Sequence, residues 1–194
     1  MARDIGIYTG TFDPVHMGHT SFAAAVRQAC HLDEVVLIPE HLPRGKQSVT
    51  DIHHRKAMLE RAVAPHVGLS SGALGTPRFS IAETLPELRR KFPGDSLTLL
   101  IGSDAAKTLL YRWEGLEQLL PEVRFAVGLR GDDTAADVAK IMKQVGLIYQ
   151  HMPDYEVVLV PSVSQVSSSG ARGGNFAALD PAVEAYIKSN KLYA

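Results

Sequence analysis

The segment "DIGIYTGTFDPVHMGH" (residues 4–19) decides the fold of this chain. Its first seven residues alternate apolar side chains and predict a short strand over 4–10 that ends at Gly10. The alanine-rich segment 19–30 has apolar residues at helical spacing and predicts a helix directly after the turn. The chain therefore opens with a strand, a turn rich in glycine and histidine, and a helix.

The rest of the chain repeats this alternation of strand and helix. Apolar runs without polar alternation predict buried strands at 34–39, 96–102, 123–130 and 155–161. Helical patterns lie between and after them, at 52–63, 80–92, 134–146 and 181–193. We therefore expect an α/β fold, a Rossmann-like doubly wound parallel sheet with helices on both faces. It forms a single domain over 1–194, with the C-terminal helical end, about 167–194, packed on it.

Composition narrows the classes of partner. The chain has 194 residues, 45% of them hydrophobic and 21% charged, and a formal net charge of −1. A near-neutral chain has no broad positive field for nucleic acid or an anionic membrane, so we expect neither partner. The single cysteine, Cys30, excludes an internal disulfide, and we find no signal peptide or membrane-spanning run. These features predict a cytoplasmic protein, and oligomeric state is not readable from them.

The turn after the first strand carries the unusual residues. Gly10 exposes backbone amides, and Gly18 lets a bulky anion approach the backbone. His16 and His19 are spaced to lie on one side of the first helical turn, where two donors of adjustable charge suit phosphoryl or nucleotidyl transfer. Zinc binding with a third ligand, such as Asp13, and a plain capped turn remain alternatives at this point.

Two blocks far apart carry a resemblance to a known family. "GTFDPVHMGH" (10–19) resembles the signature of the H-x-G-H nucleotidyltransferases, and most of all that of bacterial nicotinate-nucleotide adenylyltransferases. "VSSSGAR" (166–172) resembles the second superfamily signature, I-S-S-T-x-x-R. Further blocks agree along nearly the whole chain, among them "HRKAMLERA" (54–62) and "IGSDAAKTLLYRW" (101–113).

The resemblance implies roles for residues around ATP. His16 and His19 would hold the reacting phosphates, and Lys46 and Arg172 would neutralise the departing pyrophosphate. Gly18 would admit the phosphates. The remaining contacts to ATP fall on the first turn and the second signature: Thr9, Gly10, Thr11, Phe12, Ser167 and Ser168. Mg²⁺ would be carried with ATP, and we assign no residue as a metal ligand.

The same resemblance implies an acceptor pocket, with Thr84, Asp104 and Trp113 as its contacts. Trp113 would stack on a pyridine ring, and Asp104 would lie near the nucleotide ligands. The chain departs from the family pattern at Arg44-Gly45, where Pro-His is usual, and at Phe79-Ser80, where Tyr-Thr is usual. These departures lie in segments expected to contact the acceptor.

The resemblance thus implies an adenylyltransferase that joins ATP to nicotinate mononucleotide, forming deamido-NAD and pyrophosphate in NAD biosynthesis. Both substrates are small molecules. Two alternatives stay open: a nucleotidyltransferase with a different phosphorylated acceptor, such as nicotinamide mononucleotide, and a nucleotide-binding sensor without turnover.

Overall fold

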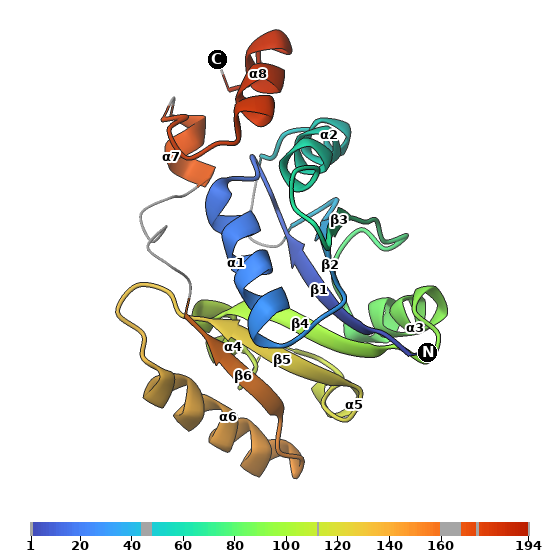
Figure 1. Ribbon diagram of the computed structural model, residues 1–194. Coiled ribbons are helices and arrows are strands. Elements are labelled where there is room, and N and C mark those ends of the chain that lie inside the picture. Colours follow the sequence, from blue (N-terminus) through green and yellow to red (C-terminus); the bar gives the residue numbers. More distant parts are fainter. Residues whose placement is uncertain (1, 44–47, 112, 160–167, 174, 194) are drawn as a thin grey trace.

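The structure is a computed structural model that describes residues 2–43, 48–111, 113–159, 168–173 and 175–193. Within these residues, one parallel sheet has the strand order β3-β2-β1-β4-β5-β6 (Figure 1). The strands are β1 (Asp4–Gly10), β2 (Glu34–Pro39), β3 (Leu69–Ser71), β4 (Ser96–Gly102), β5 (Val123–Gly128) and β6 (Asp154–Val158). This order is that of a doubly wound sheet, so the expected fold class is confirmed.

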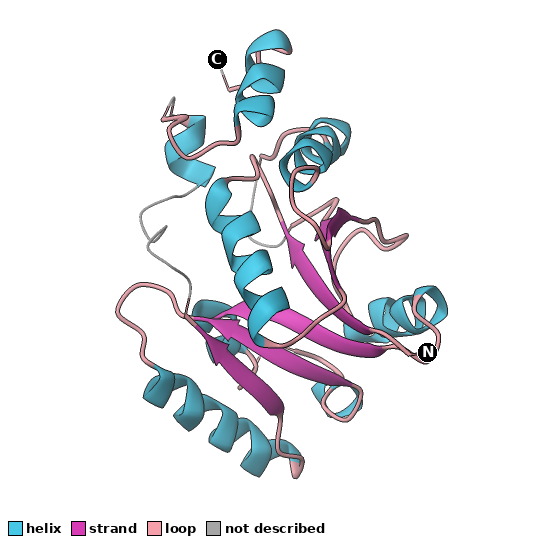
Figure 2. Cartoon of the chain, in the orientation of Figure 1, coloured by secondary structure: helices cyan, strands magenta, loops and turns pink. Residues whose placement is uncertain are grey.

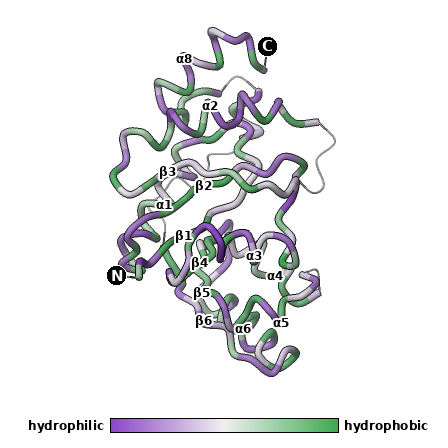
Figure 3. Tube along the Cα trace, turned by 90° about the vertical axis from the view of Figure 1, so that its right-hand side faces the viewer, coloured by the Kyte–Doolittle hydropathy of each residue, from purple (hydrophilic) through white to green (hydrophobic). Residues whose placement is uncertain are grey.

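Helices cover both faces of the sheet (Figure 2). The helices are α1 (Met17–Ala29), α2 (Ile52–Val63), α3 (Ile81–Lys91), α4 (Ser103–Thr108), α5 (Leu116–Leu119), α6 (Ala135–Tyr149), α7 (Ser168–Arg172) and α8 (Pro181–Ser189). Hydrophilic and hydrophobic residues alternate along α2 and α8, as expected for helices that bury one side (Figure 3).

Two hydrophobic clusters make the core, one on each face of the sheet. One cluster joins residues of α3, α4, α5 and α6 to one side of the strands, including Ile5 and Ile7 of β1. The other joins residues of α1, α2 and α8 to the opposite side, including Tyr8. Because successive strand residues point to opposite faces, a strand buried on both faces reads as a continuous apolar run.

The C-terminal segment belongs to the second cluster. Ala171 of α7 and Val183 and Ile187 of α8 are buried in it, and α8 packs against α2 (Figure 1). Asp180 caps α8 by accepting a hydrogen bond from the N–H of Ala182. Residues at the end of the chain thereby come next to the turn that follows β1.

Several element bounds differ from those expected. β5 ends at Gly128, two residues before the predicted end of that strand. α6 continues to Tyr149, three residues beyond the predicted end of that helix. α1 begins at Met17 because His16, with extended backbone, is its N-cap. β3, α4 and α5 have no counterpart among the predicted elements, since runs of three to six residues give too little periodicity to read.

The topology places a switch point between β1 and β4. Chain crossovers on the two sides of this point run in opposite directions, and loops after both strands open there, at the carboxyl edge of the sheet. The turn after β1 and the start of α4 after β4 therefore face one another across a common crevice.

Candidate functional site

The turn between β1 and α1 is tightly packed. Phe12 has a left-handed backbone, with φ of 48°, and its side chain is buried. A Cβ added to Gly10 would lie 3.0 Å from the Phe12 ring, tighter than ordinary contact, so Gly10 lets the ring fold back beneath the strand end. This packing fixes the path of the backbone into α1.

His16 and His19 lie together at the start of α1, as their spacing predicts. Their rings stack with centroids 3.7 Å apart and planes at 25°. The backbone N–H of His16 donates a hydrogen bond to Nδ1 of His19 over 3.2 Å. Because Nδ1 accepts, Nε2 is the nitrogen that carries the proton in the neutral His19 ring.

His16 is neutral near pH 7. Its side chain is buried, and burial lowers its pKa to about 4, with the positive charge of Arg130 acting in the same direction. Its Nδ1 is buried and makes no hydrogen bond within the part of the chain that the structure describes. Because buried polar atoms in proteins are usually hydrogen-bonded, this nitrogen is a candidate for a hydrogen bond with a ligand.

The second signature block meets the first at this turn. Ser168 donates from Oγ to the Pro14 carbonyl over 3.0 Å, and Arg172 donates from Nη1 to the Asp13 carbonyl over 2.6 Å. α7, which carries both donors, lies beside the start of α1 (Figure 1). Two segments that are 154 and 159 residues apart at these contacts therefore form one site.

Arg55 is a site-forming residue that sequence reasoning missed. Its side chain is 1% exposed, and its guanidinium donates to the carbonyls of Thr50 (2.7 Å), Thr11 (2.9 Å), Glu40 (2.6 Å) and His41 (3.0 Å). These hydrogen bonds connect the turn after β1, at Thr11, to Glu40 and His41 before residues 44–47 and to Thr50 after them. The signal was present, because Arg55 lies at helical spacing from Met58, Leu59 and Ala62 on the buried side of α2.

Asp13 and Tyr193 form a second internal tie. The Asp13 carboxylate is buried and accepts hydrogen bonds from the Tyr193 hydroxyl over 2.6 Å and from the Thr50 N–H over 3.2 Å. Burial and the hydrogen bond to Asp13 raise the pKa of Tyr193, so its hydroxyl keeps its proton. Asp13 is therefore engaged within the protein.

A pocket of about 390 Å³ opens beside the histidines. It is lined by residues of β1 and the following turn, of β4 and α4, and of more distant loops: Tyr8, Thr9, Gly10, Thr11, Phe12, His19, Leu100, Ile101, Gly102, Asp104, Ala105, Trp113, Arg130 and Ser168. Eight of the residues predicted from the sequence to contact nucleotide or acceptor thus line one pocket: Thr9, Gly10, Thr11, Phe12, His19, Asp104, Trp113 and Ser168. Gly18 lies in the first turn of α1 and is not among the lining residues.

A larger pocket of about 770 Å³ adjoins the first and shares Thr9, Gly10, Thr11 and Trp113 with it. Trp113 is half-buried, donates from Nε1 to Thr108 Oγ1 over 2.8 Å, and packs near Phe79 with ring centroids 5.6 Å apart. The two rings give this pocket an aromatic wall. Glu40, Glu114 and Glu117 also line it, so the pocket has an acidic rim.

Thr84 lies away from both pockets. Its side chain is 0% exposed, and its Oγ1 accepts a hydrogen bond from the Ser80 N–H over 3.1 Å at the start of α3. The residues of this block that line the larger pocket are Phe79, Ser80, Ile81 and Ala82. The Thr84 hydroxyl thus stabilises the helix start instead of facing a ligand.

Two other predicted residues, Lys46 and Ser167, lie outside the described residues, as do the departures Arg44 and Gly45. Among the residues that are described, no three His, Cys, Asp or Glu side chains gather at metal-binding distance. No helix in that part of the chain is long and apolar enough to cross a membrane.

The fold and the site define a class. A parallel sheet of this order, with stacked imidazoles and a hydrogen-bonded arginine at the turn that borders a pocket at its switch point, is typical of nucleotide-binding α/β proteins that act on phosphates. The chain belongs to the cytidylyltransferase-like family, whose model matches residues 7–173.

Similar curated proteins carry one name. The chain is 28% identical to a probable nicotinate-nucleotide adenylyltransferase of Gloeobacter violaceus, over 100% of this chain and 97% of that protein. It is 29% identical to the nicotinate-nucleotide adenylyltransferase of Bacillus subtilis, over 80% of this chain and 81% of that protein. A probable enzyme of the same name from Shewanella frigidimarina is 36% identical, over 59% of this chain and 57% of that protein.

Solved structures share the fold. Plasmodium falciparum nicotinic acid mononucleotide adenylyltransferase complexed with NaAD superposes with a TM-score of 0.78 at 20% identity, covering 98% of this chain and 97% of that one. The same enzyme complexed with APC gives a TM-score of 0.76. The likeness extends over essentially the whole chain, the C-terminal helices included.

Proposed function

We propose that this protein transfers AMP from ATP to nicotinate mononucleotide, forming deamido-NAD and pyrophosphate in NAD biosynthesis. One observation carries the proposal: hydrogen bonds join the turn between β1 and α1 to Ser168 and Arg172 of α7. The joined segments border the smaller pocket, and the larger pocket beside it has an aromatic wall. Similarity over the whole chain to enzymes of this name supports the same reaction. We further propose that it acts in the cytoplasm, as a biosynthetic enzyme similar to bacterial enzymes of this name.

The reaction needs positioning and charge neutralisation more than covalent chemistry. A phosphate oxygen of the acceptor attacks the α-phosphorus of ATP, a new P–O bond forms, and the bond to the β-phosphate oxygen breaks as pyrophosphate leaves. His19 donates from Nε2 to the oxygens that gain charge in the transition state. His16, which is neutral, holds a reacting phosphate as a hydrogen-bond partner.

The departing pyrophosphate needs positive charge. Arg172 supplies it at α7, where its guanidinium is already oriented by the Asp13 carbonyl and by Ser169 Oγ. Lys46 supplies a second cation in this proposal. Mg²⁺ would be carried by the ATP substrate and would neutralise phosphate charge, and it would need few protein ligands because Mg²⁺ usually keeps several waters.

The larger pocket receives the acceptor. Its pyridine ring is a cation when bound to ribose, and such a ring is attracted to the faces of Trp113 and Phe79. Asp104, in the smaller pocket, is placed to accept from a sugar hydroxyl. Ser80, Ile81 and Ala82 line the larger pocket, and in this proposal they hold the ring substituent.

A second acceptor is favoured by one observation. Glu114 and Glu117 line the larger pocket, and an acidic lining favours a neutral amide over a carboxylate on the pyridine ring. Nicotinamide mononucleotide is therefore the alternative acceptor.

The experiment is a pyrophosphate-release assay with ATP, Mg²⁺ and a panel of phosphorylated acceptors. We expect turnover on nicotinate mononucleotide well above that on nicotinamide mononucleotide or any other acceptor. Turnover mainly on another acceptor would overturn the substrate assignment. ATP binding without product from any acceptor would identify a nucleotide-binding sensor instead.

A further inference from the structure

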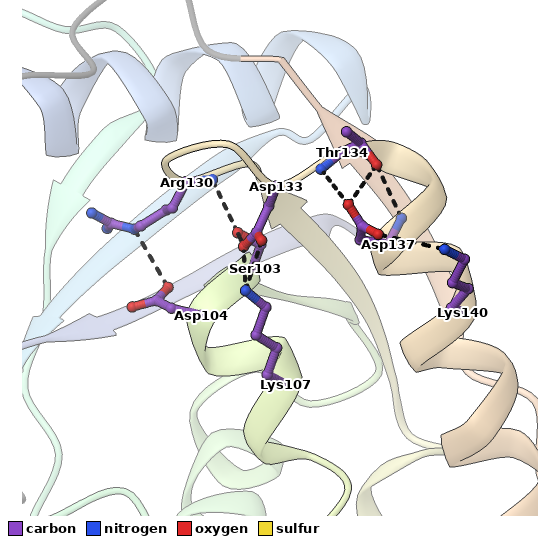
Figure 4. Close-up of polar contacts among 8 residues, drawn as sticks. All are labelled: Ser103, Asp104, Lys107, Arg130, Asp133, Thr134, Asp137 and Lys140. Carbon is purple, nitrogen blue, oxygen red and sulfur yellow. Dashed lines mark hydrogen bonds and ion pairs between the residues drawn. The ribbon is translucent and has the colours of Figure 1, made fainter.

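A polar cluster lies behind the smaller pocket, where α4 meets the loop after β5 (Figure 4). Ser103, the first residue of α4, is 0% exposed. Its Oγ accepts a hydrogen bond from the Arg130 N–H over 2.9 Å and donates one to Asp133 Oδ2 over 2.7 Å. One buried hydroxyl thus fixes two points of the loop that carries Arg130.

Lys107 completes the cluster. Its Nζ donates to both carboxylate oxygens of Asp133, over 2.7 and 2.8 Å. The hydrogen bond from Lys107 lowers the pKa of Asp133, and the same bond raises the pKa of Lys107, so both groups are charged at neutral pH. Ser103, Asp133 and Lys107, which we call the α4 cluster, fasten the loop to the helix by charge-assisted bonds.

The loop held in this way delivers Arg130 to the pocket. The Arg130 side chain lines the smaller pocket together with His19 and Asp104, and its Nε lies 3.5 Å from Asp104 Oδ1. A Cβ on Gly102 would come within 2.8 Å of Nε, so the side chain runs directly over this glycine. Figure 4 shows Arg130 and Asp104 facing one another beside the cluster.

The ion pair with Asp104 is weak, because both side chains are more than half exposed, at 54% and 71%. A doubly charged phosphate group is a stronger partner for a guanidinium than one exposed carboxylate, since it offers more acceptor oxygens and more charge. A substrate phosphate in the smaller pocket would therefore compete well with Asp104 for the Arg130 guanidinium.

We propose that the α4 cluster is a positioning device for the nucleotide site: it fixes the backbone at Arg130 so that the guanidinium meets the phosphate oxygens of bound nucleotide. This inference rests on the proposed function, which places phosphates in the smaller pocket. Ser103, Asp133 and Lys107 act through Arg130 and do not touch the substrate themselves.

A neighbouring network offers a matched control. Asp137 accepts from the Thr134 N–H and hydroxyl, over 3.0 and 2.6 Å, and pairs with Lys140 at 3.7 Å. This network caps the start of α6 and lies beside the α4 cluster in Figure 4. Like the α4 cluster, it combines a carboxylate, a hydroxyl and a lysine. None of its three residues, all within the described part of the chain, lines the smaller pocket or makes a hydrogen bond to the Arg130 backbone.

The test compares the variants Ser103→Ala, Lys107→Met, Asp133→Asn and Arg130→Met with Asp137→Asn as the control. For each we would measure thermal unfolding, kcat and KM with both substrates, and the Kd for ATP with Mg²⁺ and for inorganic pyrophosphate by calorimetry. Lys107→Arg tests whether a replacement cation restores the wild-type values.

We expect Arg130→Met to raise the Kd for ATP and for pyrophosphate by about 10- to 100-fold, since a charge-assisted hydrogen bond is lost. The α4 cluster variants should raise both values about 3- to 10-fold, mainly through KM for the nucleotide, and Lys107→Arg should restore most of the affinity. Asp137→Asn should lower the unfolding temperature and leave both Kd values unchanged.

Wild-type affinity in the α4 cluster variants would overturn the inference, and so would an equal loss in Asp137→Asn. If the wild-type protein binds ATP and the cluster variants weaken it while nicotinate mononucleotide gives no product, the acceptor assignment fails and the positioning role stands. If the wild-type protein turns over and the variants match it, only the positioning role fails. A wild-type protein that binds neither ATP nor pyrophosphate overturns both.

Discussion

The two pockets of the site are built in opposite ways. The turn beside the smaller pocket is buried, with Phe12, Asp13 and His16 at most 6% exposed, and distant side chains hold its backbone. The far wall of the larger pocket comes from short segments in which Phe79 and Trp113 are half-buried and Glu114 is exposed. Under the proposed function, the chemistry depends on a buried, internally bonded network, while the choice of acceptor rests on accessible side chains that can change without unfolding the protein.

The largest effect on turnover should come from a substitution at the turn beside the smaller pocket. We expect His19→Ala to lower kcat for pyrophosphate release by about 10²-fold or more, because a donor to the transition state is lost. The circular dichroism spectrum should stay unchanged. His53→Ala, at an exposed position on α2, is the matched control and should retain wild-type turnover. Near-normal turnover of folded His19→Ala would remove His19 from the mechanism.

Arg55→Met tests whether the buried network holds the turn. It leaves buried carbonyl oxygens without their donor, so the free energy of unfolding should fall by about 3 kcal/mol. At a temperature where the variant is folded, kcat should also fall, by about 10-fold on the scale expected when reacting groups lose their alignment. Denaturant unfolding and initial rates measure the two effects.

The control for Arg55→Met is Arg61→Met on the same helix. Arg61 is exposed, donates to the Ala57 carbonyl and lies over the Tyr186 ring. Its loss should cost less than about 1 kcal/mol and leave kcat unchanged. Full activity in folded Arg55→Met would mean that the turn keeps its geometry without this tie.

Trp113→Ala tests the role of the larger pocket in binding the acceptor. It removes an aromatic wall from the acceptor pocket, and stacking of this kind is worth about 1–3 kcal/mol, so KM for nicotinate mononucleotide should rise about 10-fold or more. The rise in KM for ATP should be smaller, and Trp113→Phe should recover part of the loss. Steady-state kinetics with each substrate varied in turn would show the difference. Because Trp113 lines both pockets, an equal rise in both KM values would contradict its proposed role as a contact of the acceptor alone.

The smallest effect concerns His16 and pH. Its pKa in the folded protein is about 4, below the 6.5 of an unfolded chain, so the unfolded state binds more protons between these values. Stability is therefore independent of this group above pH 6.5 and falls as the pH drops. The change from pH 7 to 5.5 should be about 1 kcal/mol.

Urea unfolding at these two pH values checks the effect, with His16→Asn as a variant that cannot titrate at this position. Between these two pH values, the unfolding free energy of His16→Asn should change by about 1 kcal/mol less than that of the wild-type protein. The same slope in both proteins would show that His16 is not buried in its neutral form.

Sequence patterns predicted the central strands and the histidine pair well, for one physical reason. β2 and β4 are buried on both faces and read as apolar runs with clear ends, while β1 was predicted from its alternating apolar residues and its end at Gly10. The i, i+3 spacing of His16 and His19 fixes their proximity once a helix begins there. Both signals are local. The joining of residues 168–172 to the turn was not local and came from the family resemblance.

Residues whose role depends on distant partners were the ones missed. Arg55, Tyr193 and Arg130 each act through contacts to other elements, and an arginine or tyrosine alone gives no sign of which carbonyl or carboxylate it will meet. Thr84 is the reverse case. The resemblance implies a contact with the acceptor, whereas its hydroxyl accepts a hydrogen bond from the Ser80 N–H and Thr84 lines neither pocket, so its role stays a prediction.

The most direct test of the account follows the adenylyl group itself. The protein is mixed with Mg²⁺ and ATP labelled at the α-phosphate, first alone and then with nicotinate mononucleotide, and label is measured on protein, dinucleotide and nucleotide. Direct transfer between two bound substrates predicts no pyrophosphate and no labelled protein without acceptor, and then equal amounts of pyrophosphate and labelled deamido-NAD. Label on the protein, or pyrophosphate released before the acceptor is added, would contradict it.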